Sequence, residues 1–219
     1  MKKLESSLIN MVVVLVAVAI ITGGLLAWVN QVTSGPIQQQ DELALANGIK
    51  SVMGLSTLTV SANDTVVQQT DGKESTFIIH KVNDAQGKFV GAAIESTSMG
   101  FGGELKVLVG FDANGKVLGY TLLQHAETPG LGAKADRWFQ KDGKGSIIGR
   151  DMKSAGRLSV NKDGGDVDAI TASTITSRAF LKAVNNAYAA YDQQHASADG
   201  CSGATVQQGK KKHGHQNPD

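Results

Sequence analysis

The sequence predicts an α+β fold, in which a mainly antiparallel β-sheet packs with helices and is preceded by one N-terminal transmembrane helix. Three observations lead to this prediction. An uncharged apolar run begins at residue 8, β-rich segments joined by hairpin turns fill the middle of the chain, and amphipathic helical segments flank them at both sequence ends. After the anchor, about 190 of the 219 residues remain, which is enough for one domain with its own core.

The apolar run from Leu8 to Val29 has the length of a membrane span, since about 22 residues at about 1.5 Å each cross a hydrocarbon core of about 30 Å. A cleaved signal peptide is the alternative, but the run is longer than a usual signal core and no clear small-residue cleavage site follows it. Lys2 and Lys3 precede the run, whereas the first charges after it are acidic. The positive-inside rule therefore predicts a single-pass protein of the cytoplasmic (inner) membrane, with a cytoplasmic N-terminus and a periplasmic domain.

The rest of the chain divides into segments of different composition. The predicted order is a cytoplasmic N-terminus (1–7), a transmembrane helix (8–29), a polar connector and short amphipathic helix (30–56), the folded domain (57–194) and a disordered tail (195–219). Within the domain we expect strands at 58–60, 77–82, 89–96, 105–111, 117–124, 158–160 and 167–170, and a helical turn at 135–140. The clearest helix runs from Ser177 to Gln194, with Thr176 or Ser177 as its N-cap.

Composition excludes several classes of protein. A balance of 21 basic and 20 acidic residues, with a net charge of +1, argues against a nucleic-acid-binding protein. The one cysteine, Cys201, excludes an intrachain disulfide framework, a Cys-ligated zinc site and an iron–sulfur cluster on this chain alone. We therefore expect no metal site and no nucleic-acid partner.

The first candidate site is the segment HAETPGLG at 125–132, which follows a predicted strand. Pro129 and Gly130 suit the central positions of a type II turn, and the glycines at 130 and 132 allow backbone N–H groups to approach a flat or anionic ligand. Glu127 is placed to accept hydrogen bonds from ligand hydroxyls or ring N–H groups. An ordinary surface turn is the alternative interpretation.

The second candidate site is the segment DAITASTITS at 168–177, which leads into the clearest helix. Ser173, Thr174, Thr176 and Ser177 place four hydroxyl groups at the helix start, where unpaired N–H groups and the helix dipole favour a phosphate. Plain N-capping is the alternative, although it needs only one hydroxyl. A third segment, SMGFGG at 98–103, is too short for a dinucleotide-binding fingerprint and precedes a strand, so it supports only close backbone packing.

The order GFGG, HAETPGLG and DAITASTITS strongly resembles the FMN-binding domain of the G subunit of Rnf-type electron transport complexes, whose sister is the C subunit of the sodium-pumping NADH:quinone reductase. The resemblance extends from the anchor to about Tyr191. It implies that a flavin transferase joins the FMN phosphate covalently to Thr174, as a phosphothreonyl ester, with Ser173, Thr176 and Ser177 beside it. It also implies that the flavin ring lies against the loop containing Glu127, Thr128, Gly130, Leu131 and Gly132.

The resemblance further implies an electron-carrier subunit of a redox-driven ion translocase, passing electrons between ferredoxin and NAD with the other Rnf subunits as partners. No catalytic residues and no independent catalysis are expected. The membrane helix has no ionisable residue, so ion coupling belongs to the partners. The alternatives are the equivalent quinone reductase subunit and a non-redox flavin-binding module for sensing or interaction.

Two departures from the family motif D-x-x-[ST]-G-A-T-x-T-S stand out. Ala172 and Ser173 occupy the Gly-Ala positions, so a positive φ at Ala172 would strain the backbone there. In the tail, the segment DGCSGAT ending at Thr205 matches the first half of the motif better, but no helix follows it. Three interpretations of this match are open: chance, a second flavin on a mobile tail, or the actual attachment site. Thr174 is preferred because only Thr174 has a helix start to seat the phosphate, and Thr205 is its rival.

Overall fold

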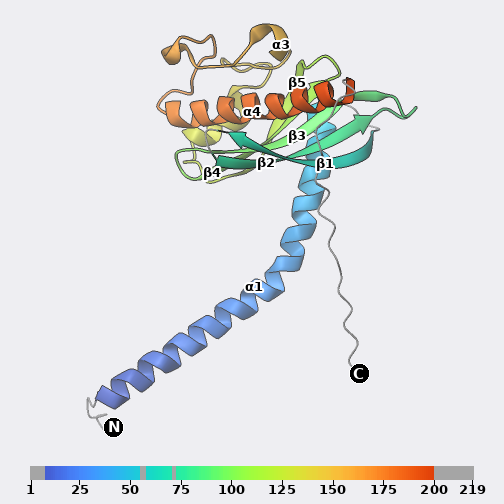
Figure 1. The fold of residues 1–219 in the computed structure, drawn as a ribbon. Coiled ribbons are helices and arrows are strands. Elements are labelled where there is room, and N and C mark those ends of the chain that lie inside the picture. The colour runs from blue at the N-terminus through green and yellow to red at the C-terminus, as the bar shows by residue number, and fades with distance from the viewer. Residues whose placement is uncertain (1–7, 55–57, 71–72, 200–219) are drawn as a thin grey trace, which may run out of the picture.

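The computed structural model describes residues 8–54, 58–70 and 73–199. Its first element is a single helix, α1 (Leu8–Met53), which bends on its way from the apolar N-terminal part to the domain (Figure 1). Pro36 lies inside this helix, and a proline bends a helix because it lacks one N–H donor. α1 is long and apolar enough to cross a membrane.

The expected polar connector at 30–40 is helical. In this stretch the Thr33 hydroxyl donates to the carbonyl of Val29 (2.8 Å) and the Ser34 hydroxyl to that of Gln31 (3.1 Å), and such bonds to the preceding turn often accompany a bend. The proline therefore interrupts one hydrogen bond without ending the helix. A Gly-Pro pair in a polar stretch is typical of a loop, and local sequence does not show that the flanking helices continue through it.

The domain is built on a five-stranded antiparallel sheet in the order β1-β2-β3-β4-β5, so the expected α+β fold is confirmed. Its strands are β1 (Thr59–Thr70), β2 (Lys73–Asn83), β3 (Phe89–Met99), β4 (Glu104–Asp112) and β5 (Val117–His125). The β1 strand was expected to end at Val60. It is longer because an edge strand bonds to only one neighbour and tolerates the polar sequence that hid it.

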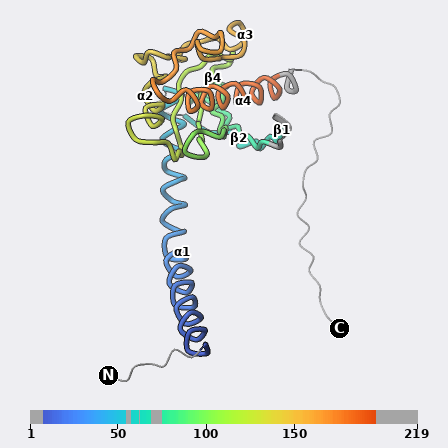
Figure 2. The backbone as a smooth tube through the Cα atoms, turned by 90° about the vertical axis from the view of Figure 1, so that its left-hand side faces the viewer, coloured from blue at the N-terminus to red at the C-terminus, as the bar shows by residue number. Residues whose placement is uncertain are grey.

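The two faces of the sheet carry two different helices (Figures 1 and 2). The helix α4 (Thr174–Asp199) lies across one face, where Phe180 stacks on Phe139 with ring centroids 4.3 Å apart. The C-terminal end of α1 covers the other face with Ile49, Val52 and Met53. Neighbouring strand residues alternate between these two cores, as the period of a β-strand requires.

The contact between α1 and the sheet depends on two glycines. A Cβ atom at Gly119 would lie 2.8 Å from the carbonyl oxygen of Val52, and one at Gly110 would lie 3.0 Å from the same atom. The backbone of α1 thus rests directly on the backbone of β4 and β5. A side chain at either position would push the helix away from the sheet.

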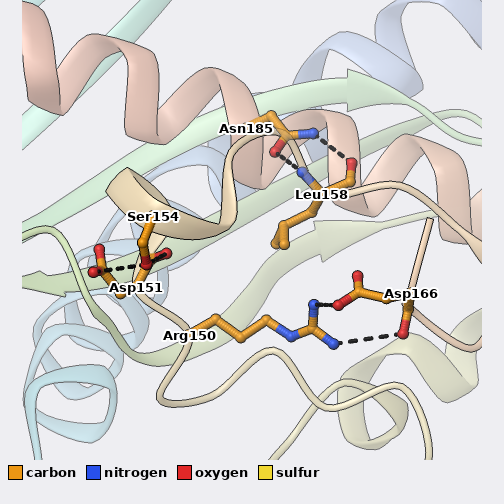
Figure 3. A network of polar contacts seen from close by, with 6 residues as sticks. All are labelled: Arg150, Asp151, Ser154, Leu158, Asp166 and Asn185. Carbon is orange, nitrogen blue, oxygen red and sulfur yellow. Dashed lines mark hydrogen bonds and ion pairs between the residues drawn. The ribbon is translucent and has the colours of Figure 1, made fainter.

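Between β5 and α4 the chain contains only short elements: η1 (Gly132–Lys134), α2 (Ala135–Trp138), α3 (Met152–Ala155) and η2 (Asn161–Asp163). The expected strands at 158–160 and 167–170 reduce to one parallel bridge between Val160 and Val167. Figure 3 shows why: the Asn185 amide of α4 accepts from the N–H of Leu158 (2.9 Å) and donates to its carbonyl (2.8 Å), so a side chain takes the place of a strand partner.

The same figure shows the ion pair between Arg150 and Asp166. This pair joins two loops of the irregular region. Together with the Asn185 amide, it fixes this region where repetitive backbone pairing is absent.

The helix α4 begins earlier and ends later than expected. Thr176 and Ser177 lie inside the helix, so neither is its N-cap. At the other end, residues 195–199 are helical, which corrects the start of the predicted disordered tail, and the His195 ring packs against Tyr191 with centroids 4.3 Å apart. Residues 200–219, with Cys201 and Thr205, lie outside the described residues.

A buried polar network crosses the sheet beside these cores. Glu95 on β3 contacts His80 on β2 (2.8 Å) and Lys106 on β4 (2.6 Å), and His80 also contacts the Asn63 side chain on β1 (2.8 Å). Burial raises the pKa of the Glu95 carboxyl, but hydrogen bonds from His80 and Lys106 and the Lys106 charge outweigh it and hold that pKa below its ordinary value. The network joins four adjacent strands through side chains.

Candidate functional site

The three segments singled out in the sequence meet around one cavity of about 380 Å³. This volume lies within the usual range for small-molecule sites. Its lining comes from the β3–β4 loop, from the segment after β5, and from the start of α4: Phe101, Glu127, Thr128, Leu131, Gly132, Ala172, Ser173, Thr174, Ile175 and Thr176. Of the expected site residues, Gly130 lines a neighbouring cavity and Ser177 is buried beneath the helix start.

Glu127 joins the three segments through its carboxylate. The side chain is buried, and it accepts hydrogen bonds from the backbone N–H groups of Phe101 (2.8 Å) and Gly102 (3.3 Å) and from the Thr176 hydroxyl (2.7 Å). The sequence had suggested that this carboxylate receives a ligand's hydrogen bonds. In the structure both oxygens receive protein donors, so Glu127 holds the walls of the cavity together.

Glycines make room for this buried carboxylate. A Cβ atom at Gly100 would lie 2.0 Å from Glu127 Oε1, and one at Gly132 would lie 2.3 Å from Oε2. Both positions are therefore closed to any side chain while Glu127 keeps its place. One glycine in each of the two motifs is thus explained by the buried Glu127 side chain.

The segment after β5 forms the expected type II turn. The N–H of Leu131 donates to the carbonyl of Thr128 (3.1 Å), and Gly130 has a φ of 77°, as the third residue of such a turn requires. The turn places the Leu131 side chain, which is 40% exposed, at the cavity. Phe101 and Ile175 are 70% and 52% exposed on the same cavity, so its rim is apolar.

The start of α4 supplies the polar end of the cavity. Ala172 precedes it with a φ of 61°, and within the described ranges no other non-glycine residue has a positive φ. This backbone conformation confirms the strain expected for an alanine at a glycine position of the motif. Thr174, the first residue of α4, is half-buried and faces the cavity, in the turn where helical N–H groups lack carbonyl partners.

Two further hydroxyls at this helix start are used inside the protein. Thr176 donates to Glu127, and the Ser177 hydroxyl donates to the carbonyl of Ser173 (3.0 Å) and accepts from the N–H of Ile170 (2.9 Å). Thr176 and Ser177 therefore hold the helix start to its neighbours. Thr174 is left as the half-exposed threonine of the cluster on the cavity.

Sequence reasoning missed Lys162. Its Nζ atom donates to Thr174 Oγ1 at 3.3 Å, although it belongs to the short turn η2. Asp163, the next residue, forms a two-point ion pair with Arg178 of α4 (2.7 and 2.6 Å), and this pairing holds the pKa of the Asp163 carboxyl below its ordinary value. The segment reads as a polar turn, and nothing in its spacing indicates that it folds back on the start of α4.

The site therefore combines an apolar rim, a helix start with a hydroxyl group, and a lysine. This combination suits a ligand with a planar ring at one end and a phosphate at the other. Comparison with known proteins agrees, since residues 100–189 match the FMN-binding domain and residues 1–52 match the RnfG N-terminal region. Fold and site together define a membrane-anchored FMN-binding domain.

Relatives identify the family more closely. The chain is 37% identical to the G subunit of the ion-translocating oxidoreductase complex of Shewanella baltica (strain OS223) over 180 residues, which cover 77% of this chain and 82% of that protein. It is 35% identical to the protein of the same name from Vibrio atlanticus (strain LGP32) over 182 residues, covering 80% and 85%. The chain belongs to the family of G subunits of the Rnf-type ion-translocating oxidoreductase complex.

Proposed function

We propose that this chain carries FMN esterified to Thr174 and passes electrons within an Rnf-type complex that couples ferredoxin and NAD to ion translocation. The observation that carries the proposal is the position of Thr174 Oγ1, which lies on the cavity, at the helix start and within hydrogen-bond distance of Lys162. Bound FMN would supply one-electron and two-electron redox chemistry. The chain's own residues would bind, orient and shield it.

Attachment to Thr174 is a phosphoryl transfer. A bond forms between Thr174 Oγ1 and the flavin phosphorus, and the hydroxyl proton passes to a basic group of the transferase. The bond between that phosphorus and the leaving phosphate of an activated flavin phosphoanhydride breaks, so no oxidant or reductant is needed. We assign this step to a separate flavin transferase, because the side chain found in contact with Thr174 Oγ1 is the Lys162 ammonium, which donates a hydrogen bond and does not take up a proton.

Each expected site residue has a proposed part. Thr128, Gly130, Leu131 and Gly132 form the turn against which the ring lies, and Glu127 fixes that turn to the start of α4. Ser173 and Thr174 bring the phosphate to the first turn of the helix, while Thr176 and Ser177 secure that turn. The helix dipole favours the remaining negative charge of the phosphodiester.

The membrane arrangement completes the proposal. The N-terminus is cytoplasmic, α1 crosses the inner membrane once, and residues 57–194 form the FMN-binding domain on the periplasmic side. The membrane-spanning part of α1 has no ionisable side chain, so the other Rnf subunits must provide the ion pathway. This chain contributes an electron-carrying site and no catalysis of its own.

The deciding experiment uses the full-length chain co-expressed with a flavin transferase. The wild-type chain should remain fluorescent after denaturing electrophoresis, and its intact mass should rise by one FMN less one water. Thr174→Val should abolish both signals, because valine keeps the shape of threonine without the hydroxyl. Thr97→Val, at an exposed position of β3, is the matched control and should load normally.

A second arm tests the rival threonine in the tail. Thr205→Val should leave the flavin in place, and peptide mass spectrometry should find it on Thr174. Fluorescence that persists in Thr174→Val and disappears in Thr205→Val would overturn the site assignment. A wild-type chain that stays colourless would overturn the covalent attachment itself.

A further inference from the structure

We infer that Lys162 is a phosphate-binding residue of this site, which holds the phosphate of an incoming or attached flavin nucleotide at Thr174 Oγ1. The inference rests on the proposed function, because it concerns the same cavity. The Lys162 ammonium lies 3.3 Å from Thr174 Oγ1, the atom that becomes the bridging oxygen of the ester. A phosphate bonded to that oxygen lies within reach of the ammonium.

The position of Lys162 is fixed by the helix it faces. Its neighbour Asp163 is bound at both carboxylate oxygens by Arg178, which lies one turn after Thr174 on α4. The turn η2 is therefore attached to the same helical turn that carries the threonine. A flexible lysine on a loop would be a weak ligand, but here its backbone is held in place.

The charges around Thr174 leave Lys162 available for an anion. The Asp163 carboxylate is engaged by Arg178, so the nearest acid in the sequence does not neutralise the lysine. A phosphodiester carries one negative charge, which one ammonium group balances. The helix start adds a partial positive charge on the other side of the same atom.

This arrangement explains how a helix start with so few charged groups can select a phosphate. A hydroxyl and free N–H groups bind many acceptors, whereas an ammonium group adds attraction for an anion. Among the described residues, the cavity lining itself contains no cation, because its members are apolar, hydroxylated or glycine apart from Glu127. Lys162 therefore supplies the charge that the lining lacks.

The test measures flavin loading on the full-length chain in detergent, with purified transferase and its flavin donor. Lys162→Gln should lower the rate of loading at limiting donor by roughly tenfold, as expected for loss of one hydrogen bond to a charged group. Lys162→Arg should recover most of the rate, because it keeps the positive charge. Lys153→Gln, an exposed lysine of α3, is the matched control and should load at the wild-type rate.

A second measurement does not depend on the rate of loading, because it compares the stability of chains that are already fully loaded with that of unloaded chains. The rise in unfolding temperature between the unloaded and fully loaded chain should be smaller in Lys162→Gln than in the wild type, and 0.5 M salt should reduce it less in the variant. Asp163→Asn should reduce loading in the same direction, because it releases η2 from Arg178. Unloaded Lys162→Gln should unfold at the wild-type temperature, since Lys162 is exposed, whereas unloaded Asp163→Asn should unfold slightly below it, since it loses an exposed ion pair with Arg178.

The outcomes separate this inference from the proposed function. If the wild-type chain loads on Thr174 while Lys162→Gln equals it in loading and in stabilisation, the role of Lys162 is overturned and the proposed function stands. If the wild-type chain does not load, the proposed function fails first. If loading falls equally in Lys162→Gln and Lys162→Arg, the lysine contacts the transferase and does not bind phosphate.

Discussion

At the scale of single residues, the Glu127 carboxylate shows how one charge can organise a binding site. It is enclosed by two backbone N–H groups from the β3–β4 loop and one hydroxyl from α4. A buried carboxylate is tolerated only when donors surround it, so the three segments must stay together for it to remain satisfied. The same three segments form the walls of the cavity, so the hydrogen bonds of Glu127 also keep the cavity in shape.

Glu127→Gln tests this role. The amide oxygen can keep the two backbone N–H donors, but its NH₂ group forces the Thr176 hydroxyl to turn from donor to acceptor, and all three hydrogen bonds lose the strength that a charged acceptor gives them. We expect the free energy of unfolding to fall by about 2 kcal/mol, measured by urea denaturation of the full-length chain in detergent. Glu104→Gln, at an exposed position of β4, should change it by less than about 0.5 kcal/mol. Equal effects in both variants would contradict a structural role of Glu127.

At this scale, local residue chemistry could be predicted from the sequence, but contacts between distant segments could not. Turn chemistry identified Gly130 correctly, and the comparison of motifs indicated that a positive φ at Ala172 would be strained, which is the φ that the structure has. The partners of Glu127 and the position of Lys162 depend on contacts between segments 12 to 49 residues apart, which the local pattern does not encode. Most of the residues that line the cavity could therefore be named from the sequence, whereas the contacts between them could not.

At the scale of elements, α1 packs very closely against the sheet face opposite α4. Val52 rests on the backbone of β4 and β5, and only glycines at 110 and 119 permit this approach. Sequence periodicity predicted the amphipathic end of α1, but it did not show that the helix continues unbroken to the membrane. The helical type of this segment could be predicted from the spacing of its apolar residues. Its continuation as one helix could not, because that depends on packing.

Gly119→Ala should disturb this contact without touching the cavity. The added methyl group would lie 2.8 Å from the Val52 carbonyl oxygen, so α1 has to shift. We expect the unfolding temperature to fall by several degrees, with faster proteolysis between α1 and β1, both measured on the full-length chain in detergent. Ala189→Gly, an exposed mid-helix position of α4, removes a methyl group elsewhere and should leave the proteolysis rate unchanged. An unaltered rate in Gly119→Ala would show that the close packing is unimportant.

At the scale of the whole molecule, the charge pattern around the anchor predicts which side of the membrane the domain occupies. Single cysteines in a Cys201→Ser background test it, with a membrane-impermeant maleimide added to spheroplasts. Ala113→Cys, in the exposed turn between β4 and β5, should react at once, as expected for the periplasmic domain that the charge pattern predicts. Ser6→Cys should react only after the membrane is broken. The reverse order would place the domain in the cytoplasm.

The unbroken course of α1 has a mechanical consequence. The 46 residues of α1, at about 1.5 Å each, give a length of roughly 70 Å along the helix axis. A little less than half of this length is needed to cross the hydrocarbon core of a bilayer. The C-terminal end of α1 packs tightly against the sheet face opposite α4. The helix itself therefore connects its apolar N-terminal part to the domain. Under the proposed function, the helix therefore sets the distance between the membrane and the cavity, and a redox partner has to approach the cavity at that distance.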